Sequence, residues 1–162
     1  KQMHEDYFPV DLNAMGAEFI FLNLNDDETL FGAHAICRPQ YNKYIGGSYA
    51  IRLEDEGAVL VFCTDIEHID GIDQNIVELA RNADLLIHDG QYTTEEYKQY
   101  KGWGHSTWRQ AIEVALQANV KKLIITHHDP DHDDEFLDKI EKECQEIFPN
   151  CVLAKEGMEV KV

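Results

Sequence analysis

Cysteine is scarce in this sequence, and no two cysteines have the spacing of a redox or zinc-finger motif. The four cysteines form no Cys-x-x-Cys pair, which excludes a zinc finger and gives no sign of a disulfide framework. Cys63 lies in an apolar run, and Cys144 falls on the apolar stripe of an expected helix. We therefore expect free, buried thiols in a cytoplasmic protein.

Long hydrophobic runs, internal repeats and low-complexity tracts are also missing. No run reaches the roughly 18 apolar residues that a membrane-spanning helix needs, so no membrane partner is expected. The first six residues are polar and acidic and do not resemble a signal peptide. With 162 residues, of which 44% are hydrophobic, the sequence predicts one globular domain over residues 1–162.

Basic residues are few compared with acidic ones. The sequence has 14 Lys and Arg against 31 Asp and Glu, which gives a formal net charge of −17. Such a surface repels phosphate backbones, so nucleic acid is an unlikely partner by this criterion. A small anionic or ester substrate stays compatible with this charge if metal cations dominate the field at the site. The acidic run Glu54-Asp55-Glu56 is interpreted as a solvated hairpin turn.

The apolar pattern predicts consecutive antiparallel strands in the first part of the chain and alternating helices and strands in the second, which is an α/β fold. Strands are expected at residues 17–24, 30–37, 47–53, 58–64, 84–88, 121–126, 152–154 and 158–162. Helices are expected at residues 73–81, 93–100, 107–118 and 134–148. Thr107 and Gln110 have the spacing of a capping box, and Asp133 and Asp134 suit the positive N-terminus of the last helix.

Three polar residues stand where apolar segments end, which is where α/β proteins gather catalytic groups. Asp65 follows one apolar strand, His127 follows another, and His105 lies in a glycine-rich turn that opens a helix. A carboxylate at a strand end is costly unless it is paired or binds a cation, and a neutral imidazole is a ligand for metals such as zinc. The pattern indicates a metal or acid–base site, with capping of a helix or turn as the structural alternative.

Weaker signals mark five further residues that we expect to support this site: His68, His88, Asp89, His128 and Asp129. Asp89 ends a strand and has the position to orient a ligand histidine. The alternating acids that begin at Asp129 do not form a calcium loop, because Asp134 stands at the glycine position and Ile140 at the glutamate position.

Taken in order, four segments resemble the C-terminal half of the metallo-β-lactamase superfamily, and within it the ribonuclease Z-like and metal-dependent phosphodiesterase branch. They are Cys63-Thr64-Asp65, Ala83-Asp84-Leu85-Leu86-Ile87-His88-Asp89, Gly104-His105-Ser106-Thr107 and Thr126-His127-His128. Each segment is weak alone, but the combination in this order is specific. The resemblance covers roughly residues 45–162. It implies a four-layer αββα sandwich, of which this chain is expected to contain only the C-terminal half to two-thirds.

The resemblance also implies the chemistry of the site. The family hydrolyses esters with two divalent metal ions, often zinc, with manganese and iron as alternatives. By position, Asp65 matches the carboxylate that bridges the two metals, and His127 matches a late histidine ligand of the second metal. His105 matches a histidine that assists the leaving group. The expected activity is hydrolysis of a phosphodiester or another ester by two-metal activation of water.

Two departures from the family pattern leave three hypotheses open. The motif His-x-His-x-Asp-His is absent, with its expected place upstream of Lys1, and Arg38 stands where a further histidine ligand is expected. The first hypothesis is the C-terminal portion of a hydrolase that an N-terminal segment completes. The second is a degenerate, metal-free relative that binds an anion as a regulatory domain. The third is a metal site completed within a homodimer by His4 or His34 of a neighbour.

Overall fold

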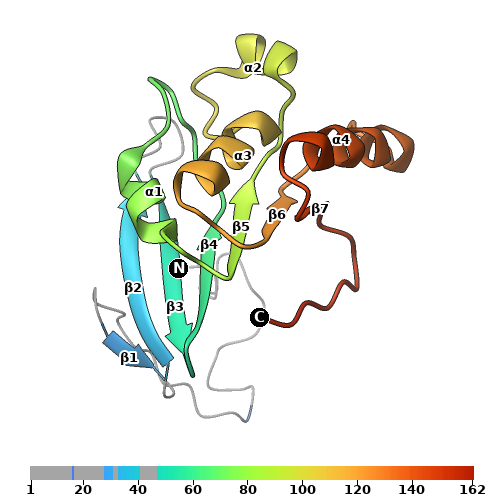
Figure 1. The fold of residues 1–162 in the computed structure, drawn as a ribbon. Coiled ribbons are helices and arrows are strands. Elements are labelled where there is room, and N and C mark those ends of the chain that lie inside the picture. Colours follow the sequence, from blue (N-terminus) through green and yellow to red (C-terminus); the bar gives the residue numbers. More distant parts are fainter. Residues whose placement is uncertain (1–15, 17–27, 31–32, 41–46) are drawn as a thin grey trace.

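One seven-stranded sheet organises the chain, with its strands arranged in the order in which they occur in the sequence (Figure 1). The computed structural model describes residues 16, 28–30, 33–40 and 47–162; the strand expected at 17–24 lies outside these residues. The strands are β1 (Glu28–Leu30), β2 (Ala33–Gln40), β3 (Ser48–Asp55), β4 (Ala58–Cys63), β5 (Leu85–Asp89), β6 (Leu123–Thr126) and β7 (Cys151–Leu153). The helices are α1 (Gln74–Ala80), α2 (Thr94–Tyr100), α3 (Trp108–Gln117) and α4 (Asp134–Ile147).

The sheet changes direction of pairing at β4. Strands β1 to β4 pair antiparallel, whereas β4, β5, β6 and β7 pair parallel. The β3–β4 hairpin turns at Glu56 and Gly57, which have φ of 48° and 86°, as a two-residue hairpin turn with both central residues left-handed requires. The parallel strands need helical crossovers, and these place the ends of β4, β5 and β6 along one edge.

Helix starts follow the capping residues of the sequence. Thr107 accepts from the backbone N–H of Gln110 while the Gln110 side chain accepts from the backbone N–H of Thr107, which completes the predicted capping box. Thr93 and Glu96 form the same box at α2. At α4 the cap is Asp133 alone, since Asp134 is already the first helical residue. Each cap satisfies backbone donors that a helix start leaves unpaired.

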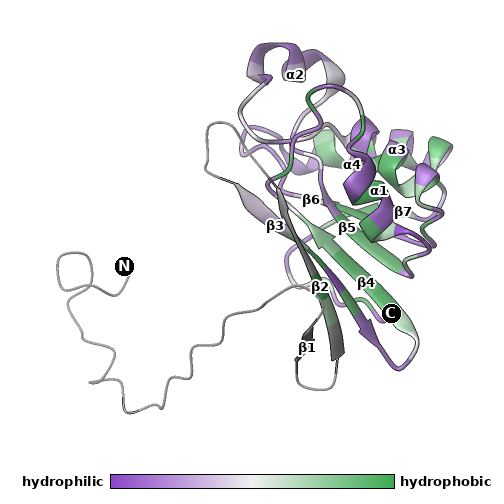
Figure 2. Ribbon diagram, turned by 90° about the vertical axis from the view of Figure 1, so that its left-hand side faces the viewer, coloured by the Kyte–Doolittle hydropathy of each residue, from purple (hydrophilic) through white to green (hydrophobic). Residues whose placement is uncertain are grey.

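The hydrophobic core lies between the sheet and the helices α1, α3 and α4, which cover one face (Figure 2). Val61, Leu86 and Ile125 point from the sheet into this layer and are fully buried. The alternate residues of the same strands point to the opposite face, where Phe62 is 41% exposed. Cys63, Cys144 and Cys151 are free and buried, as expected. The described helices are all too short and too polar to span a membrane.

The C-terminal segment differs from expectation, because residues 158–162 form no strand. Met158, Val160 and Val162 instead line an apolar groove together with Leu60 and Phe62 of β4. An alternating pattern predicts one apolar side of a segment; here that side lines the groove beside β4 while Met158 and Val162 stay 40% and 53% exposed, and the segment does not join the hydrogen-bonded ladder. The uncovered sheet face is therefore shielded in part by the end of the chain.

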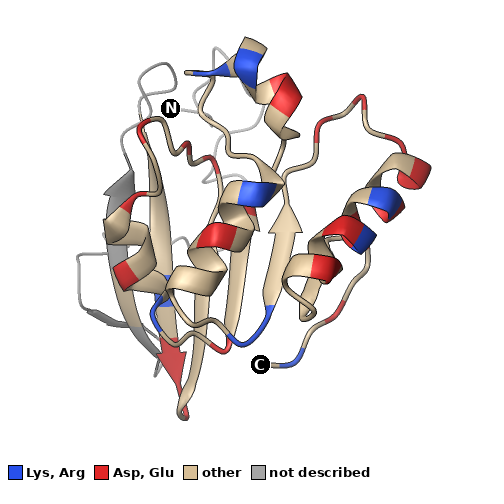
Figure 3. Cartoon of the chain, turned by 45° about the horizontal axis from the view of Figure 1, so that its top comes forward, with Lys and Arg blue, Asp and Glu red and all other residues tan. Residues whose placement is uncertain are grey.

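The acidic residues lie mainly over the helices and the connecting loops, with few basic residues among them (Figure 3). Some carboxylates have a basic partner: Asp84 contacts Lys121 at 2.5 Å, and Asp138 contacts Lys155 at 2.9 Å. Water and salt screen exposed pairs of this kind, so they add little to the stability of the fold. The fold therefore depends mainly on the core and the helix caps.

Replacing Thr107 by Ala removes both hydrogen bonds of its side chain in the capping box of α3. We expect the free energy of unfolding to fall by about 1 kcal/mol, because the backbone N–H of Gln110 loses its acceptor, Thr107 Oγ1, at the start of α3. Urea denaturation followed by circular dichroism measures this change. Thr94→Ala, at an exposed position of α2, is the matched control and is expected to stay within about 0.5 kcal/mol. Equal effects of the two substitutions would contradict the assignment.

Candidate metal and catalytic site

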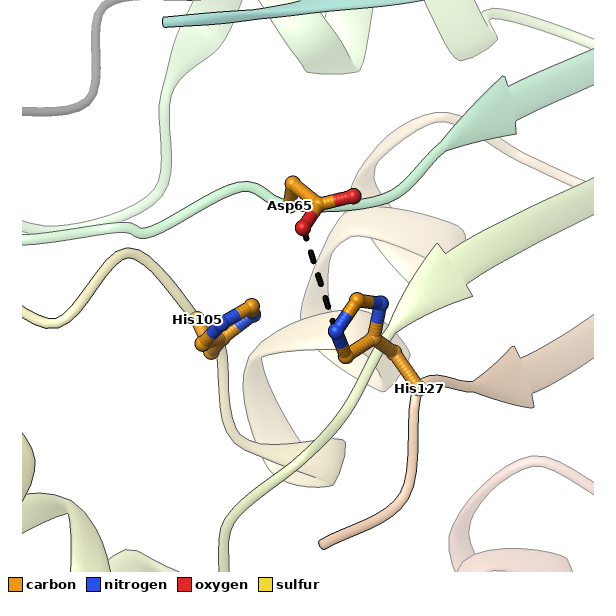
Figure 4. A group of neighbouring side chains, drawn as sticks. All are labelled: Asp65, His105 and His127. Carbon is orange, nitrogen blue, oxygen red and sulfur yellow. Dashed lines mark ion pairs between the residues drawn. The ribbon is translucent and has the colours of Figure 1, made fainter. Parts of the chain in front are cut away.

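Three side chains from distant parts of the sequence converge at the edge where the parallel strands end (Figure 4). Asp65 follows β4, His127 follows β6, and His105 precedes α3. One ligand atom from each lies within 4.8 Å of the others. Asp65 Oδ1 is 3.8 Å from His127 Nε2, and the rings of His105 and His127 have centroids 4.6 Å apart. A carboxylate and two imidazoles in this arrangement are a donor set for a divalent metal.

The backbone turns sharply at two of these residues. Asp65 has φ of 55° and His127 has φ of 62°, in the left-handed region that side chains other than glycine rarely adopt. Ser48 Oγ donates to the Asp65 carbonyl at 2.8 Å and helps to hold the first turn. Left-handed conformations of residues other than glycine cost energy and are found often at functional sites. Here they follow β4 and β6 directly and bring both side chains to the same point.

Asp89, at the end of β5, connects the segments that carry Asp65 and His105. Its carboxylate is fully buried and accepts from the backbone N–H groups of Asp65 at 3.1 Å, Ser106 at 3.0 Å and Gln91 at 3.3 Å. His105 Nδ1 lies 2.9 Å from Asp89 Oδ2. Since the carboxylate only accepts, His105 Nδ1 carries the proton, and Nε2 is the nitrogen left to act on a metal or a substrate.

His105 lies in an environment that favours its charged form. Burial on its own disfavours the imidazolium, but the hydrogen bond and negative charge of Asp89 outweigh burial and raise the pKa of His105. The charges of Asp65 and Glu67 act in the same direction. The ring is therefore protonated up to a higher pH than an ordinary histidine, as a proton donor requires.

Glu67 is a structural residue of the site that no sequence signal identified. Its carboxylate accepts from the backbone N–H of Gly102 at 2.5 Å and of Gly104 at 2.9 Å, and from the Tyr97 hydroxyl at 2.7 Å. Both glycines have positive φ, of 92° and 96°. Glu67 thereby fixes the turn that delivers His105. The contacts join residues 30 to 37 positions apart, so only the folded chain reveals them.

His68 and His88 form a buried pair behind Asp89. The Asp73 N–H donates to His68 Nδ1 at 3.1 Å, which leaves His68 Nε2–H to donate to His88 Nε2 at 3.3 Å. His88 Nδ1–H then donates to the Asp89 carbonyl at 2.6 Å. Burial lowers the pKa of both histidines to about 4. Both rings are neutral at pH 7 and support the backbone at Asp89; neither points a free nitrogen into the site.

The other candidate residues lie around the site. His128 Nε2 lies 3.3 Å from the Ala154 carbonyl, and burial is the main cause that lowers its pKa. Asp129 Oδ2 accepts from Gln91 Nε2 at 3.4 Å. Arg38 lies in β2 opposite Ala50, and its side chain is outside the described part of the structure.

The family model described as the beta-lactamase superfamily domain matches residues 29–128. The chain belongs to the metallo-β-lactamase superfamily. A ribonuclease Z of Prochlorococcus marinus (strain MIT 9515) is 38% identical over 110 residues, which are 66% of this chain and 34% of that protein. A ribonuclease Z of Gemmatimonas aurantiaca is 32% identical over 120 residues, 74% of this chain and 37% of that protein. The chain thus spans about a third of the length of these relatives.

Solved structures confirm the fold. The metallo-beta-lactamase fold protein YhfI of Bacillus subtilis aligns with a TM-score of 0.69 at 21% identity, over 86% of this chain and 54% of that one. The short form of human tRNase Z aligns with a TM-score of 0.55 at 21% identity, over 64% of this chain and 38% of that one. The expected α/β fold, a partial metallo-β-lactamase-like sandwich, is therefore confirmed.

Asp89→Asn tests the central role of the Asp89 carboxylate. An amide has one acceptor oxygen and one donor nitrogen, so the nitrogen faces at least one N–H that Asp89 now satisfies. We expect a loss of about 2–4 kcal/mol in the free energy of unfolding, because buried donors are left without a partner. Urea denaturation measures the loss. The control Asp70→Asn, in an exposed turn, is expected to change the free energy of unfolding by less than about 0.5 kcal/mol. If Asp89→Asn also loses less than about 0.5 kcal/mol, Asp89 does not have the central role assigned to it.

The buried pair His68 and His88 predicts a stability that depends on pH. Burial holds their pKa values in the folded chain near 4, below the 6.5 of an ordinary histidine. The unfolded chain therefore binds protons that the folded pair excludes. Stability is complete above pH 6.5 and falls as the pH drops toward 4, by up to about 1 kcal/mol per pH unit for each histidine. Urea denaturation between pH 7 and 5 checks this slope. His88→Gln and His68→Gln are expected to flatten it, and an unchanged slope in both variants would contradict the prediction.

Proposed function

We propose that this chain supplies Asp65 and His127 to the metal centre of a phosphodiester hydrolase, and His105 to the leaving group. The convergence of these three side chains at one strand edge carries the proposal. The names of the relatives support it, since those proteins are called ribonucleases. Membership of the superfamily is consistent with it.

The residues present fit a divalent metal. Carboxylate oxygen and imidazole nitrogen are ordinary zinc ligands, and tetrahedral bonds of about 2.1 Å place neighbouring donor atoms roughly 3.4 Å apart. The 3.8 Å between Asp65 Oδ1 and His127 Nε2 is close to that separation. We propose two divalent ions in the complete centre, with zinc first and manganese or iron as alternatives.

The metal centre, when bound, supplies a hydroxide near neutral pH and offsets the charge on the phosphate. The chain's own residues then act on the leaving group. His105 holds one proton at Nδ1 against Asp89 and a second at Nε2 when charged. Nε2 donates its proton to the departing oxygen, and Asp89 keeps the ring in place throughout. Asp65 and His127 are held in their turns before any substrate arrives, so little reorganisation is needed.

The substrate class that we propose is a phosphodiester, and RNA belongs to this class. The net charge of −17 predicted that nucleic acid is an unlikely partner, yet the relatives carry the name ribonuclease. Net charge describes repulsion of the whole chain, whereas a metal centre sets the local field at the scissile phosphate. Charge alone is therefore no ground for excluding RNA. The metal-free alternative depends on Arg38, whose side chain is outside the described part of the structure.

Metal binding tests the proposal. The 162-residue chain is dialysed against micromolar zinc, and bound zinc is measured by elemental mass spectrometry. We expect the wild-type chain to retain zinc, and Asp65→Asn and His127→Gln each to lose most of it, because each removes a donor atom. The control His132→Gln removes a histidine that contacts Glu96 outside the cluster and is expected to retain zinc. A wild-type chain that binds no zinc, manganese or iron would contradict metal binding by this chain alone; it would leave a centre completed by an N-terminal segment and the metal-free hypothesis.

His105→Gln separates the two roles open to this residue. As a proton donor, His105 is dispensable for metal binding, so the variant is expected to retain zinc. Its hydrolysis of the dinucleotide UpU, whose departing alkoxide needs a proton, is expected to fall about 10²–10⁴-fold relative to the wild type, which is the contribution typical of a general acid. Loss of zinc in this variant would assign His105 as a ligand instead.

A further inference from the structure

A large pocket opens beside His105, on the side of the site that faces α2. Its volume is about 720 Å³, within the range of pockets that hold small ligands. Aromatic rings dominate the lining, which consists of Gln91, Tyr92, Tyr100, Lys101, Trp103, His105 and Asp129. Because His105 belongs to both the pocket and the candidate site, a molecule in the pocket lies next to the group that acts on the substrate.

The aromatic rings form a continuous wall that begins at His105. The edge of Tyr92 meets His105 with centroids 6.2 Å apart, and Tyr92 stacks on Tyr100 at 4.9 Å with an interplanar angle of 17°. Tyr100 in turn meets Trp103 edge to face at 5.2 Å. Trp103 ends the wall and is 59% exposed. An indole that stays in water at the mouth of a pocket leaves a large flat surface for a ligand to cover.

Backbone hydrogen bonds hold the turn that carries Trp103 before any ligand binds. The backbone N–H of Trp103 donates to the Tyr100 carbonyl at 3.0 Å. On both sides of Trp103, the N–H groups of Gly102 and Gly104 donate to Glu67. Tyr92 is 3% exposed, and burial raises its pKa to about 12, with the charge of Asp129 acting in the same direction. A rigid aromatic wall loses little conformational freedom when a flat ligand stacks on it.

We propose that this pocket binds the nucleobase of a nucleotide whose phosphate lies at Asp65, His105 and His127. This proposal takes the position of the phosphate from the proposed function. A nucleobase is flat, which suits stacking on Tyr100 and Trp103, and its polar edge suits Gln91 and Asp129 at the pocket wall. An alkyl chain would leave these polar groups facing a ligand that cannot pair with them. The pocket thus selects a nucleotide among phosphodiesters.

Binding to the metal-free chain tests this proposal without requiring activity. Adenosine monophosphate, adenosine and ribose 5-phosphate are titrated into the 162-residue chain in the presence of chelator. The chain has two tryptophans, Trp103 and the buried Trp108, so stacking is reported by the part of the tryptophan fluorescence that Trp103→Leu removes, and calorimetry reports affinity. We expect adenosine monophosphate and adenosine to quench the fluorescence and ribose 5-phosphate to leave it unchanged. Adenosine monophosphate is expected to bind at least about fivefold more tightly than ribose 5-phosphate, because each stacked base contributes to binding.

Two variants locate the base in the pocket. Tyr100→Leu and Trp103→Leu are each expected to weaken binding of adenosine monophosphate at least about fivefold in calorimetry. Trp103 is exposed, so its replacement leaves the fold intact even if Tyr100→Leu lowers stability; thermal unfolding checks both. The control Leu116→Ala changes an exposed apolar residue of α3 outside the pocket and is expected to bind like the wild type.

Equal affinity for adenosine monophosphate and ribose 5-phosphate would overturn the nucleobase pocket, as would unchanged affinity in both aromatic variants. The outcome is separate from that of the metal experiment, since chelator is present throughout. A chain that binds adenosine monophosphate through Trp103 but takes up no zinc supports the pocket and contradicts metal binding by this chain alone. A chain that takes up zinc but does not distinguish the base supports the hydrolase and refutes the pocket.

Discussion

The buried carboxylate of Asp89 is the interaction on which the rest of the site depends. It accepts from three backbone N–H groups and faces His105 Nδ1. These donors belong to the turn after β4, the turn after β5 and the start of α3. A buried anion is tolerated only when its lone pairs are satisfied. The same requirement that stabilises the carboxylate therefore sets the relative positions of Asp65 and His105.

Parallel strand topology explains why the site forms at this edge. Strands β4, β5 and β6 are neighbours and run in the same direction, so the residues that follow them meet at the same end of the sheet. Asp89 ends the middle strand opposite Thr126 of β6. Asp65 and His127 leave the outer two strands through left-handed turns. The site therefore needs three strand ends and one helix start, and α1 and α3 on a single face provide the crossovers.

Local patterns in the sequence predicted the parts of the fold that depend on local physics. The capping box at Thr107, the strand before Asp65 and the strand before His127 are each encoded within a few residues. Contacts between distant residues were not predictable in this way. The three bonds of Glu67 and the tautomers of the His68–His88 pair depend on segments brought together by the sheet. Alternation at 158–162 indicated a strand, because packing against a sheet face gives the same period as pairing at its edge.

In the proposed function and the proposed nucleobase pocket, His105 connects proton donation to the choice of substrate. Through Nδ1 it is fixed on Asp89, and its ring is also the first member of the aromatic wall that leads to Trp103. In this proposal, a base stacked on that wall places its phosphate at a set distance from His105 Nε2. The same side chain therefore positions the substrate and donates the proton. Glu67 supports both, because it holds the turn that carries Trp103 and delivers His105. A change that loosens this turn would then reduce affinity and proton transfer together, whereas a change confined to Asp65 or His127 would act on the metal alone.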